Sequence, residues 1–488
     1  MENQDKKPNI IAIIGAIVLL VLAVVGLSYA FFSAFIKNGE TDPSIEGTGA
    51  NLSLVYTDGK SVITSSNIMP GWSATKTFTV TNNGEADTYY KLNISNITNE
   101  FVEGGLTFSI ASADGGTSVA EQAVGTTTRT ISPSITIAEG ATHTYTITAK
   151  YVNLDKDQTP DLGKSFSYTI GIEASQKPTF KDIILANNEV KTPITTPGAA
   201  VSTSSEALLA SAEDDYGTSY YFRGAVTNNY VEFANKCWRI VRIGGDNTAK
   251  LILHNDNISN ASNPCSSANN STTAAFVHYD GNIYKSEFNS NYNDNAYVGF
   301  MYGTPGSTTY EATHANTNKS TILTNLETWY NNNLKTYESV IDNNVFCNDK
   351  SLSSGSGYSA NATDYAARER LYTSKIPSLK CNGELSKITS KIGLITADEL
   401  AFAGYAVRGY ITTSYLKENA TGYSWWSLSP AGFYNKSLSY VFRVRSDNDA
   451  IDICNVNVDS SVRPVISLVS SITISGVSGT SEDPYVVK

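Results

Sequence analysis

The stretch GYSWWSLSP, residues 422–430, places two of the chain's five tryptophans side by side. In an extended strand, neighbouring side chains point to opposite faces, so Trp426 shares a face with Leu428 and Trp425 shares the other with Tyr423. We therefore expect the Trp426 side chain to lie in a hydrophobic core. For Trp425 the pattern favours packing against a helix or loop, and the alternative is a ring that stacks on a sugar.

The whole chain has 488 residues, more than one hydrophobic core usually accommodates, so we expect several domains. Its formal net charge is -11 and no basic stripe interrupts this acidic balance, so we expect no nucleic acid partner. Only 17% of the residues are charged, and 29 are tyrosines. Such a composition is typical of β-rich surface proteins and unusual for a cytosolic enzyme.

Residues 1–37 predict a membrane anchor or a signal segment. No charged residue lies at positions 10–36, and a helix of that length would exceed the ~30 Å hydrocarbon core of a bilayer. Lys6 and Lys7 precede this run, so we expect the N-terminus in the cytoplasm and the body outside, after a single pass through the cell membrane. The alternative is cleavage after Ala30, the last residue of a small-x-small motif, which would give a secreted protein.

Residues 48–176 alternate between apolar and polar side chains in several runs. In THTYTITAKY the inward face takes Tyr145, Ile147, Ala149 and Tyr151, and mostly threonines occupy the solvent face. No helical pattern of any length interrupts these runs, so we expect an all-β antiparallel sandwich. The other expected inward residues are Phe78, Val80, Phe166, Tyr168, Ile170 and Ile172, and Asn82-Asn83-Gly84 predicts a turn.

The segment MPGWSATKTFTVTNNGEADTYYKLNIS, behind a hydrophobic leader that ends SYAFFSA, resembles the camelysin and TasA family of exported biofilm-fibre proteins. The resemblance implies a jelly-roll-like sandwich and a role in the matrix or at the surface. It also implies self-association, in which each subunit donates an N-terminal strand to its neighbour. That strand would be FFSAFIK, Phe31 to Lys37, if the chain is cleaved after Ala30.

The segment between the two domains, residues 177–205, is expected to be a linker. Its part KTPITTPGAAVSTSS is rich in Pro, Thr, Ser and Ala and is uncharged after Lys191, so it cannot bury enough apolar surface to fold by itself. All five cysteines lie after residue 220, which indicates that the flanking domains differ in kind.

Residues 206–488 mix helical and strand patterns, so we expect an α+β domain with few helices. STILTNLETWYNNNLKTYESVI predicts one helix, and TADEL predicts a short helix that opens with a capping box of Thr396 and Glu399 and stops at Gly404. Strands are expected at CWRIVRIGG, AKLILHN, SYVFRVRS and RPVISLVS. The buried stripe of the first helix is expected to comprise Leu323, Leu326, Tyr330, Leu334, Tyr337 and Ile341.

This second domain resembles a widespread, largely uncharacterised domain of bacterial surface proteins. The pieces that match, in order, include CWRIVRI, KLILHND, FCNDKS, IGLITADE, WWSLSP, SVRPVISL and GTSEDPYVV. That family looks like a divergent branch of the C-type-lectin-like fold, which formylglycine-generating enzymes and diversified ligand-binding proteins also use. The resemblance implies the fold and does not imply one function, because a fold hosts many sites.

The cysteines are expected to form structural disulfides, as cysteines outside the cell usually do. Cys347 and Cys381 bracket a loop that has little core of its own, so we pair them first. Such a link would stabilise the fold by about 3 to 4 kcal/mol on the loop-entropy argument. We expect Cys237 to pair with Cys265, which leaves Cys454 odd.

The sequence holds no specific motif for catalysis, metal binding or cofactor binding. The four histidines are far apart in sequence, and no H-E-x-x-H, C-x-x-C, G-x-S-x-G or phosphate-binding glycine loop is present. SDNDAID, with Asp447, Asp449 and Asp452, has nearly the spacing of a calcium loop but lacks its glycine and distal glutamate. We expect a hairpin tip there and neither metal nor cofactor, with calcium as the alternative.

Together these features predict a non-enzymatic adhesion or binding protein at the cell surface, with a lectin-like head on a β-sandwich stalk. Its ligand is expected to be a glycan or protein on host or neighbouring cells. The alternatives are a biofilm-matrix fibre subunit and an enzyme on the formylglycine-generating scaffold, with a deep pocket lined by titratable groups of perturbed pKa. By analogy with the diversified relatives, the expected ligand-binding residues are Tyr434, Asn435, Arg443 with its guanidinium facing out, Asp447, Asn448 and Asp449, with Trp425 as a further candidate.

Overall fold

The chain folds into two compact units that divide between Pro178 and Thr179, and each is described by itself. The computed structural model describes residues 54–58, 68–84, 86–175, 178–201, 203–409, 413–472, 474–475 and 478–487. The anchor or signal segment expected at 1–37 lies outside these residues. Among the helices that are described, none is both long and apolar enough to cross a membrane.

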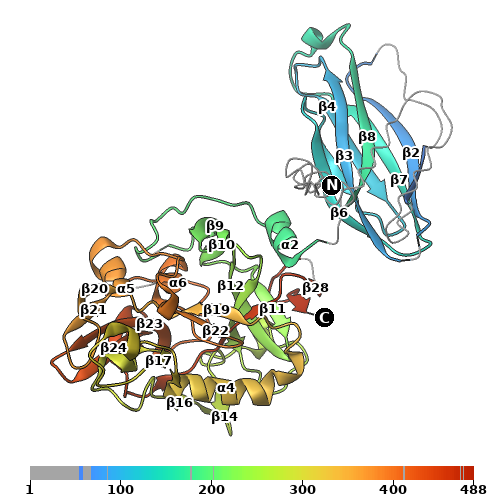
Figure 1. The fold of residues 1–488 in the computed structure, drawn as a ribbon. Coiled ribbons are helices and arrows are strands. Elements are labelled where there is room, and N and C mark those ends of the chain that lie inside the picture. Colours follow the sequence, from blue (N-terminus) through green and yellow to red (C-terminus); the bar gives the residue numbers. More distant parts are fainter. Residues whose placement is uncertain are drawn as a thin grey trace, which may run out of the picture. The chain divides into compact units, whose positions relative to one another are not determined.

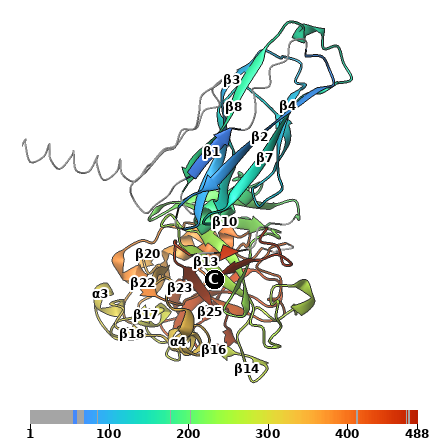
Figure 2. The same ribbon diagram turned by 90° about the vertical axis from the view of Figure 1, so that its right-hand side faces the viewer.

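The first unit is an antiparallel β-sandwich, as the alternating runs predict (Figure 1 and Figure 2). One sheet has the strand order β1-β2-β7-β4-β5 and the other has the order β6-β3-β8, and every neighbouring pair is antiparallel. The strands are β1 (Leu54–Asp58), β2 (Trp72–Asn82), β3 (Thr88–Asn99), β4 (Leu106–Ser112), β5 (Val119–Ala123), β6 (Arg129–Ile137), β7 (Thr142–Tyr151) and β8 (Phe166–Ser175).

The inward faces of these strands form one hydrophobic core. The four expected residues of β7, Tyr145 to Tyr151 at every second position, are all buried, as are Phe78 and Val80 of β2. Phe166 and Tyr168 of β8 are only partly buried, because they lie towards the start of their strand. The predicted turn is present: the Asn82 side chain accepts a hydrogen bond from the Gly84 N–H at 2.9 Å, and the chain crosses there from one sheet to the other.

The linker expected over 177–205 folds onto the second unit from Phe180 on. Helix α2 (Phe180–Asn187) opens with a capping box and buries Phe180 and Ile184 in the core of that unit. Further along, the Arg223 guanidinium donates to Thr195 Oγ1 at 2.9 Å and to the Ala199 carbonyl at 3.1 Å. The composition alone predicts a segment that does not fold by itself. In the structure, Arg223 of the following domain supplies hydrogen bonds that hold the segment in place.

The second unit is built on two mixed sheets with a few short helices, which fits the expected α+β pattern. The first sheet runs β27-β13-β12-β11-β29-β28, with β10 and β9 attached to β12. The second runs β16-β26-β23-β21-β20, with β24 and β25 attached to β23. The expected strands CWRIVRI, AKLILHN, SYVFRVRS and RPVISLVS are β12, β13, β24 and β27.

The strands of the first sheet are β9 (Ala207–Asp214), β10 (Gly217–Gly224), β11 (Tyr230–Phe233), β12 (Lys236–Ile243), β13 (Ala249–Asn255), β27 (Val465–Leu468), β28 (Ile474–Ser475) and β29 (Tyr485–Val487). Those of the second are β16 (Lys285–Ser286), β20 (Leu352–Gly355), β21 (Thr363–Tyr365), β23 (Trp425–Tyr434), β24 (Leu438–Val444), β25 (Ile451–Asn455) and β26 (Ser460–Ser461). Three small pairs complete the unit: β14 (His278–Tyr279) with β15 (Asn282–Ile283), β17 (Met301–Tyr302) with β18 (Asn318–Lys319), and β19 (Asn344–Cys347) with β22 (Lys387–Ser390).

The predicted long helix is shorter than its apolar pattern. Helix α4 (Thr321–Asn333) ends after three asparagines, which are poor helix formers, and Ile341 joins a β-bridge with Leu468 instead. Helix α6 (Ala397–Phe402) has the predicted capping box, and Gly404 follows it at φ +111°. The remaining helical segments are α3 (Tyr310–Thr313), α5 (Ala366–Arg368), a π-turn over Glu369–Ser374 and 3₁₀ turns at Thr159–Asp161, Ser267–Asn269, Asn295–Val298, Lys335–Tyr337 and Glu384–Ser386.

Both tryptophans of GYSWWSLSP are completely buried, because β23 is a central strand that pairs with β21, β24 and β26. Trp426 lies in the core as predicted, where its Nε1 donates to the Ser286 carbonyl at 2.7 Å. Trp425 lies beside the Arg463 guanidinium, 5.1 Å from the ring centre. The alternative of a sugar-stacking Trp425 is therefore wrong, since its ring has no exposed face.

Candidate functional site

The residues predicted to bind ligand lie at the two opposite ends of β24. Tyr434 ends β23 and Asn435 follows it in the turn that leads into β24, whereas Asp447, Asn448 and Asp449 form the expected hairpin tip that leads out of β24. A strand of that length separates the two ends by roughly 20 Å. These five residues, and Arg443 near the second end of β24, therefore do not form one contact surface.

At the first end, Tyr434 is held by charged neighbours. Arg368 Nη1 donates to the Tyr434 hydroxyl at 3.0 Å, and that hydroxyl donates to Asp364 Oδ1 at 2.6 Å. The Arg368 guanidinium also lies 5.2 Å from the ring centres of both Tyr434 and Tyr372. Burial, with the Asp364 contact, raises the pKa of Tyr434 far above its ordinary value. At this end, the tyrosine rings and the Arg368 guanidinium hold one another in place. Asn435, beside them, is exposed.

At the second end, the aspartates face cations of the protein itself. Asp447 accepts hydrogen bonds from Arg445, at 2.9 Å from Nε, and Asp449 pairs with Lys417 at 2.9 Å. Asp452 pairs with Arg445 at 3.2 Å. The three carboxylates that suggested calcium are thus directed at arginine and lysine, and the described residues hold no group of His, Cys, Asp or Glu placed to bind a metal ion.

Arg443 does not face out as predicted. It is half-buried, its Nη1 donates to Ser460 Oγ at 3.3 Å, and its Nε is buried without a hydrogen-bond partner. The parity argument fails because the face that Arg443 shares with Ser439 and Val441 is also covered, and both of these residues are completely buried. Of the seven candidates, Trp425 is therefore inaccessible and Arg443 is less accessible than predicted.

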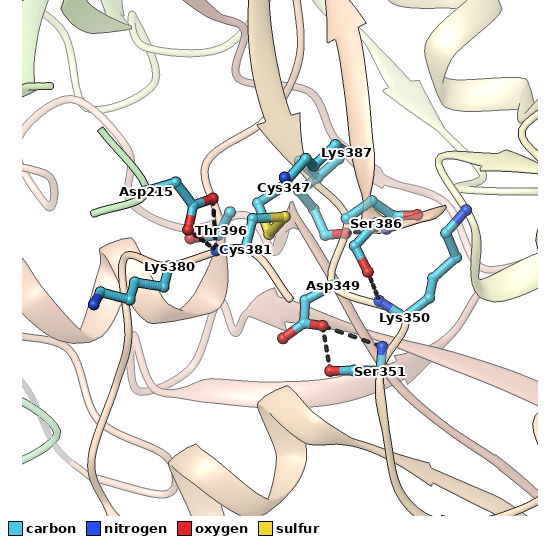
Figure 3. The surroundings of a disulfide bond; sticks show 12 residues. Asp215, Cys347, Asp349, Lys350, Ser351, Lys380, Cys381, Ser386, Lys387 and Thr396 are labelled. Carbon is cyan, nitrogen blue, oxygen red and sulfur yellow. Dashed lines mark hydrogen bonds between the residues drawn. A yellow bond between two sulfur atoms is a disulfide. The ribbon is translucent and has the colours of Figure 1, made fainter. Parts of the chain in front are cut away.

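Both predicted disulfides are present. Cys347 of β19 pairs with Cys381, and Cys237 pairs with Cys265, which leaves Cys454 free and buried. Figure 3 shows the first bond with the Asp215 carboxylate facing the Cys381 N–H, at 3.1 Å from Oδ2. Burial raises the pKa of the Cys454 thiol above its ordinary value.

Beside the Cys347–Cys381 bond lies a cluster of buried charges, the kind of pocket that the enzyme alternative predicts. Glu399 Oε1 accepts from Lys250 Nζ at 2.7 Å and from Arg242 Nε at 3.0 Å. Arg242 also pairs with Asp214 at 2.8 Å. Burial by itself would raise the pKa of Glu399, but Lys250 and Arg242 outweigh it and lower the pKa to about 2.

A second part of this cluster is held by Arg370. Its Nε and Nη2 donate to the two oxygens of Asp398 at 2.8 and 2.9 Å, and its Nη1 donates to Asp349 at 2.7 Å. The cleft between these groups has a free volume of about 40 Å³, far below the roughly 300–1,000 Å³ of small-molecule sites. The buried charges face one another, so the arrangement ties α6 to β12, β13 and the π-turn.

Two open clefts flank the loop at 269–272. The larger, which we call the amide cleft, has a free volume of about 570 Å³ and lies between the loops 255–259 and 269–274, the β14–β15 hairpin, Lys285 and Tyr423. The smaller has about 500 Å³ and lies between Ala225 and the segments 270–272 and 413–421. Ser271 lines both clefts.

Sequence reasoning missed the amide cleft. Its lining comes from the segment 255–285, with Tyr423 added from far along the chain, and that segment contains no recognised binding motif. The available signal was the run NDNISNASNPCSSANNSTT, which is too polar for a core and too long for a simple turn.

Comparison with known proteins adds no assignment to this geometry. No protein-family model matches the chain, and no curated protein matches it significantly.

Proposed function

We propose that this chain is a binding protein displayed at the cell surface, in which the first unit is the stalk and the second unit carries the ligand site. The proposal includes a jelly-roll-like topology for the stalk and a C-type-lectin-like fold for the head. Attachment is through the 1–37 segment, or the protein is secreted if cleavage follows Ala30. The ligand is a glycan or protein on host or neighbouring cells.

The observation that carries the proposal is the contrast between the charged cluster and the amide cleft. In the cluster, the ionisable groups form ion pairs with one another. The free volume between them is only about 40 Å³. In the amide cleft, polar groups surround about 570 Å³ that opens to solvent. A site with room and few ionisable groups suits binding better than acid–base chemistry.

Two disulfides support the exported location. Cytosolic thiols are kept reduced, so structural disulfides are typical of extracellular proteins. Both lie in the second unit, and Cys347 and Cys381 also line the cleft of the charged cluster.

The test is adhesion by cells that produce the full-length chain, measured against host cells and glycan arrays beside cells that lack it. We expect producing cells to bind at least one glycan or cell type above the background. Equal binding by both kinds of cell, across arrays and cells, would contradict the proposal.

The fibre-subunit alternative rests on the edges of the sandwich. β6 and β8 end the three-stranded sheet, and an added strand from another copy could pair with such an edge. This alternative predicts Phe31 as the first residue of protein recovered from cells and filaments from purified material. An intact Met1 would favour the anchored form.

A further inference from the structure

The amide cleft has a wall that is already fixed by hydrogen bonds. Asn255 Nδ2 donates to the Pro264 carbonyl at 3.0 Å and to the Asn269 carbonyl at 2.9 Å. Asn257 Nδ2 donates to the Asn235 carbonyl at 2.9 Å, and its Oδ1 accepts from the Ala261 N–H. These amides are buried and saturated, so they shape the cleft and leave recognition to other side chains.

The Asp256 carboxylate at the cleft wall is paired with a lysine that lies outside the cleft. Lys236 Nζ, which does not line the cleft, lies 2.7 Å from Asp256 Oδ1, and both side chains are largely buried. The other oxygen accepts the backbone N–H of His278 at 2.9 Å. This acid therefore does not make the cleft a cation site.

The cleft also has one cationic side chain, Lys285, that is accessible to a ligand. Lys285 is exposed, forms no ion pair with any described residue, and holds its Nζ 5.1 Å from the centre of the Tyr423 ring. The Tyr423 ring is half-buried and packs edge-on against Phe276, at 6.1 Å between ring centres. The Tyr423 ring is fixed by this packing and holds the Lys285 ammonium at the cleft through a cation–π contact.

The His278 side chain also lines the cleft, beside the Asp256 carboxylate. The His278 side chain is only 5% exposed, and its Nδ1 is buried without a hydrogen bond, 3.7 Å from Asp256 Oδ2. The cleft is also lined by the hydroxyls of Ser259, Ser271 and Thr273, which form no side-chain hydrogen bond within the described structure. Hydroxyls both donate and accept, so these three suit a ligand that carries many hydroxyls.

We propose that the amide cleft binds an acidic sugar, that is, a sugar unit that carries a carboxylate or a phosphate. The anion pairs with the Lys285 ammonium, and the sugar hydroxyls bond to the side-chain hydroxyls of Ser259, Ser271 and Thr273. This inference rests on the proposed binding function and names its ligand class and site. The position of the Lys285 ammonium, 5.1 Å from the centre of the Tyr423 ring, sets where the anion docks in the cleft.

The experiment uses the full-length chain in detergent micelles and titrates three probes by saturation-transfer NMR. The probes are D-glucuronate, D-glucose 6-phosphate and neutral D-glucose, which separate the two sources of anion from the sugar itself. We expect at least one acidic sugar to bind about tenfold tighter than glucose, a difference of about 1.4 kcal/mol, because only the acidic sugars can pair with the Lys285 ammonium. Equal affinity for all three, or no detectable binding of either acidic sugar, would overturn the proposal.

Variants locate the site. Lys285→Gln should bring the acidic sugars down to the affinity of glucose, and Ser259→Ala with Ser271→Ala should weaken all three probes alike. The matched control Lys436→Gln, at an exposed lysine of the β23–β24 turn, should change nothing. All four positions are exposed, so the melting temperature should be unchanged. If Lys285→Gln keeps full binding, the cleft assignment is wrong while the adhesion assay above still stands.

Discussion

The Lys250 ammonium and the Glu399 carboxylate lie 2.7 Å apart in the interior of the second unit, with side-chain exposures of 5% and 3%. Glu399 also fixes the start of α6, because its Oε2 accepts the Thr396 N–H at 3.0 Å. One carboxylate thus joins a helix cap to two cations from the neighbouring sheet. This relationship gives the charged cluster a structural role in the second unit.

Glu399→Gln should destabilise the second unit by about 3–5 kcal/mol, because Lys250 and Arg242 would lose a buried counter-charge. Tryptophan fluorescence during urea unfolding measures this, since four of the five tryptophans lie in that unit. The control is Glu384→Gln, at an 87% exposed partner of Lys387, which should cost less than about 1 kcal/mol. Equal effects of the two changes would contradict the structural role.

Stability of the second unit should fall as the pH drops below about 6.5. Burial lowers the pKa of His314 to about 3, so the unfolded chain takes up a proton from pH 6.5 downward that the folded state refuses. Glu399, with its pKa lowered to about 2, adds a further loss below pH 4.5, where the unfolded carboxylate protonates first. Each group contributes a slope of up to about 1.4 kcal/mol per pH unit.

Urea unfolding at several pH values between 7.5 and 4 tests this dependence. His314→Gln should reduce the slope between pH 6.5 and 4.5, since the buried imidazole is gone. A residual slope is expected, because burial also lowers the pKa of His254. An unchanged slope in the variant would show that His314 is not the titrating group.

Trp426→Ala should cost about 3–5 kcal/mol, since the ring is completely buried and packs edge-on against Phe288. Trp426→Phe should cost less, but it would leave the Ser286 carbonyl without its donor. As a control, Tyr216→Ala removes a 53% exposed ring and should stay within about 0.5 kcal/mol. Thermal melting of the three variants gives the order, and a mild Trp426→Ala would refute the core assignment.

Replacing Cys347 and Cys381 together by serine should lower stability by about 3–4 kcal/mol, because the bond closes a span of 34 residues in the unfolded chain. Cys454→Ser is the control, and peptide mapping without reductant should find both disulfides intact in it. Finding Cys454 linked to another cysteine in the parent protein would contradict the pairing.

Much of the fold could be predicted because local patterns agree with the global one. The alternation in β7, the capping box of α6 and the strand pattern of β12 each depend on neighbouring residues alone. The helix over 321–341 was predicted too long because the apolar spacing continues past the point where Asn331 to Asn333 end it. Periodicity reports which side chains are apolar, and low helix propensity decides where the backbone leaves the helix.

The candidate site was less predictable, for a spatial reason. Tyr434 and Asp449 are close in sequence but lie at opposite ends of β24, whereas Tyr423 and Ser259 are far apart in sequence and line one cleft. β14, β16 and α4 lie side by side at one end of the second unit (Figure 1 and Figure 2), an arrangement that only the completed sheets define. Contacts of this kind follow from topology rather than from any local motif.

The most direct test of the binding account is the adhesion assay with a cleft-blocking variant. Ser271→Trp places a bulky ring on the exposed loop between the two open clefts, and Ser437→Trp places the same ring on the exposed turn before β24. Cells producing the parent or Ser437→Trp should adhere equally, and cells producing Ser271→Trp should not. Full adhesion by Ser271→Trp, or its loss in Ser437→Trp alone, would contradict the claim that the second unit binds through its clefts.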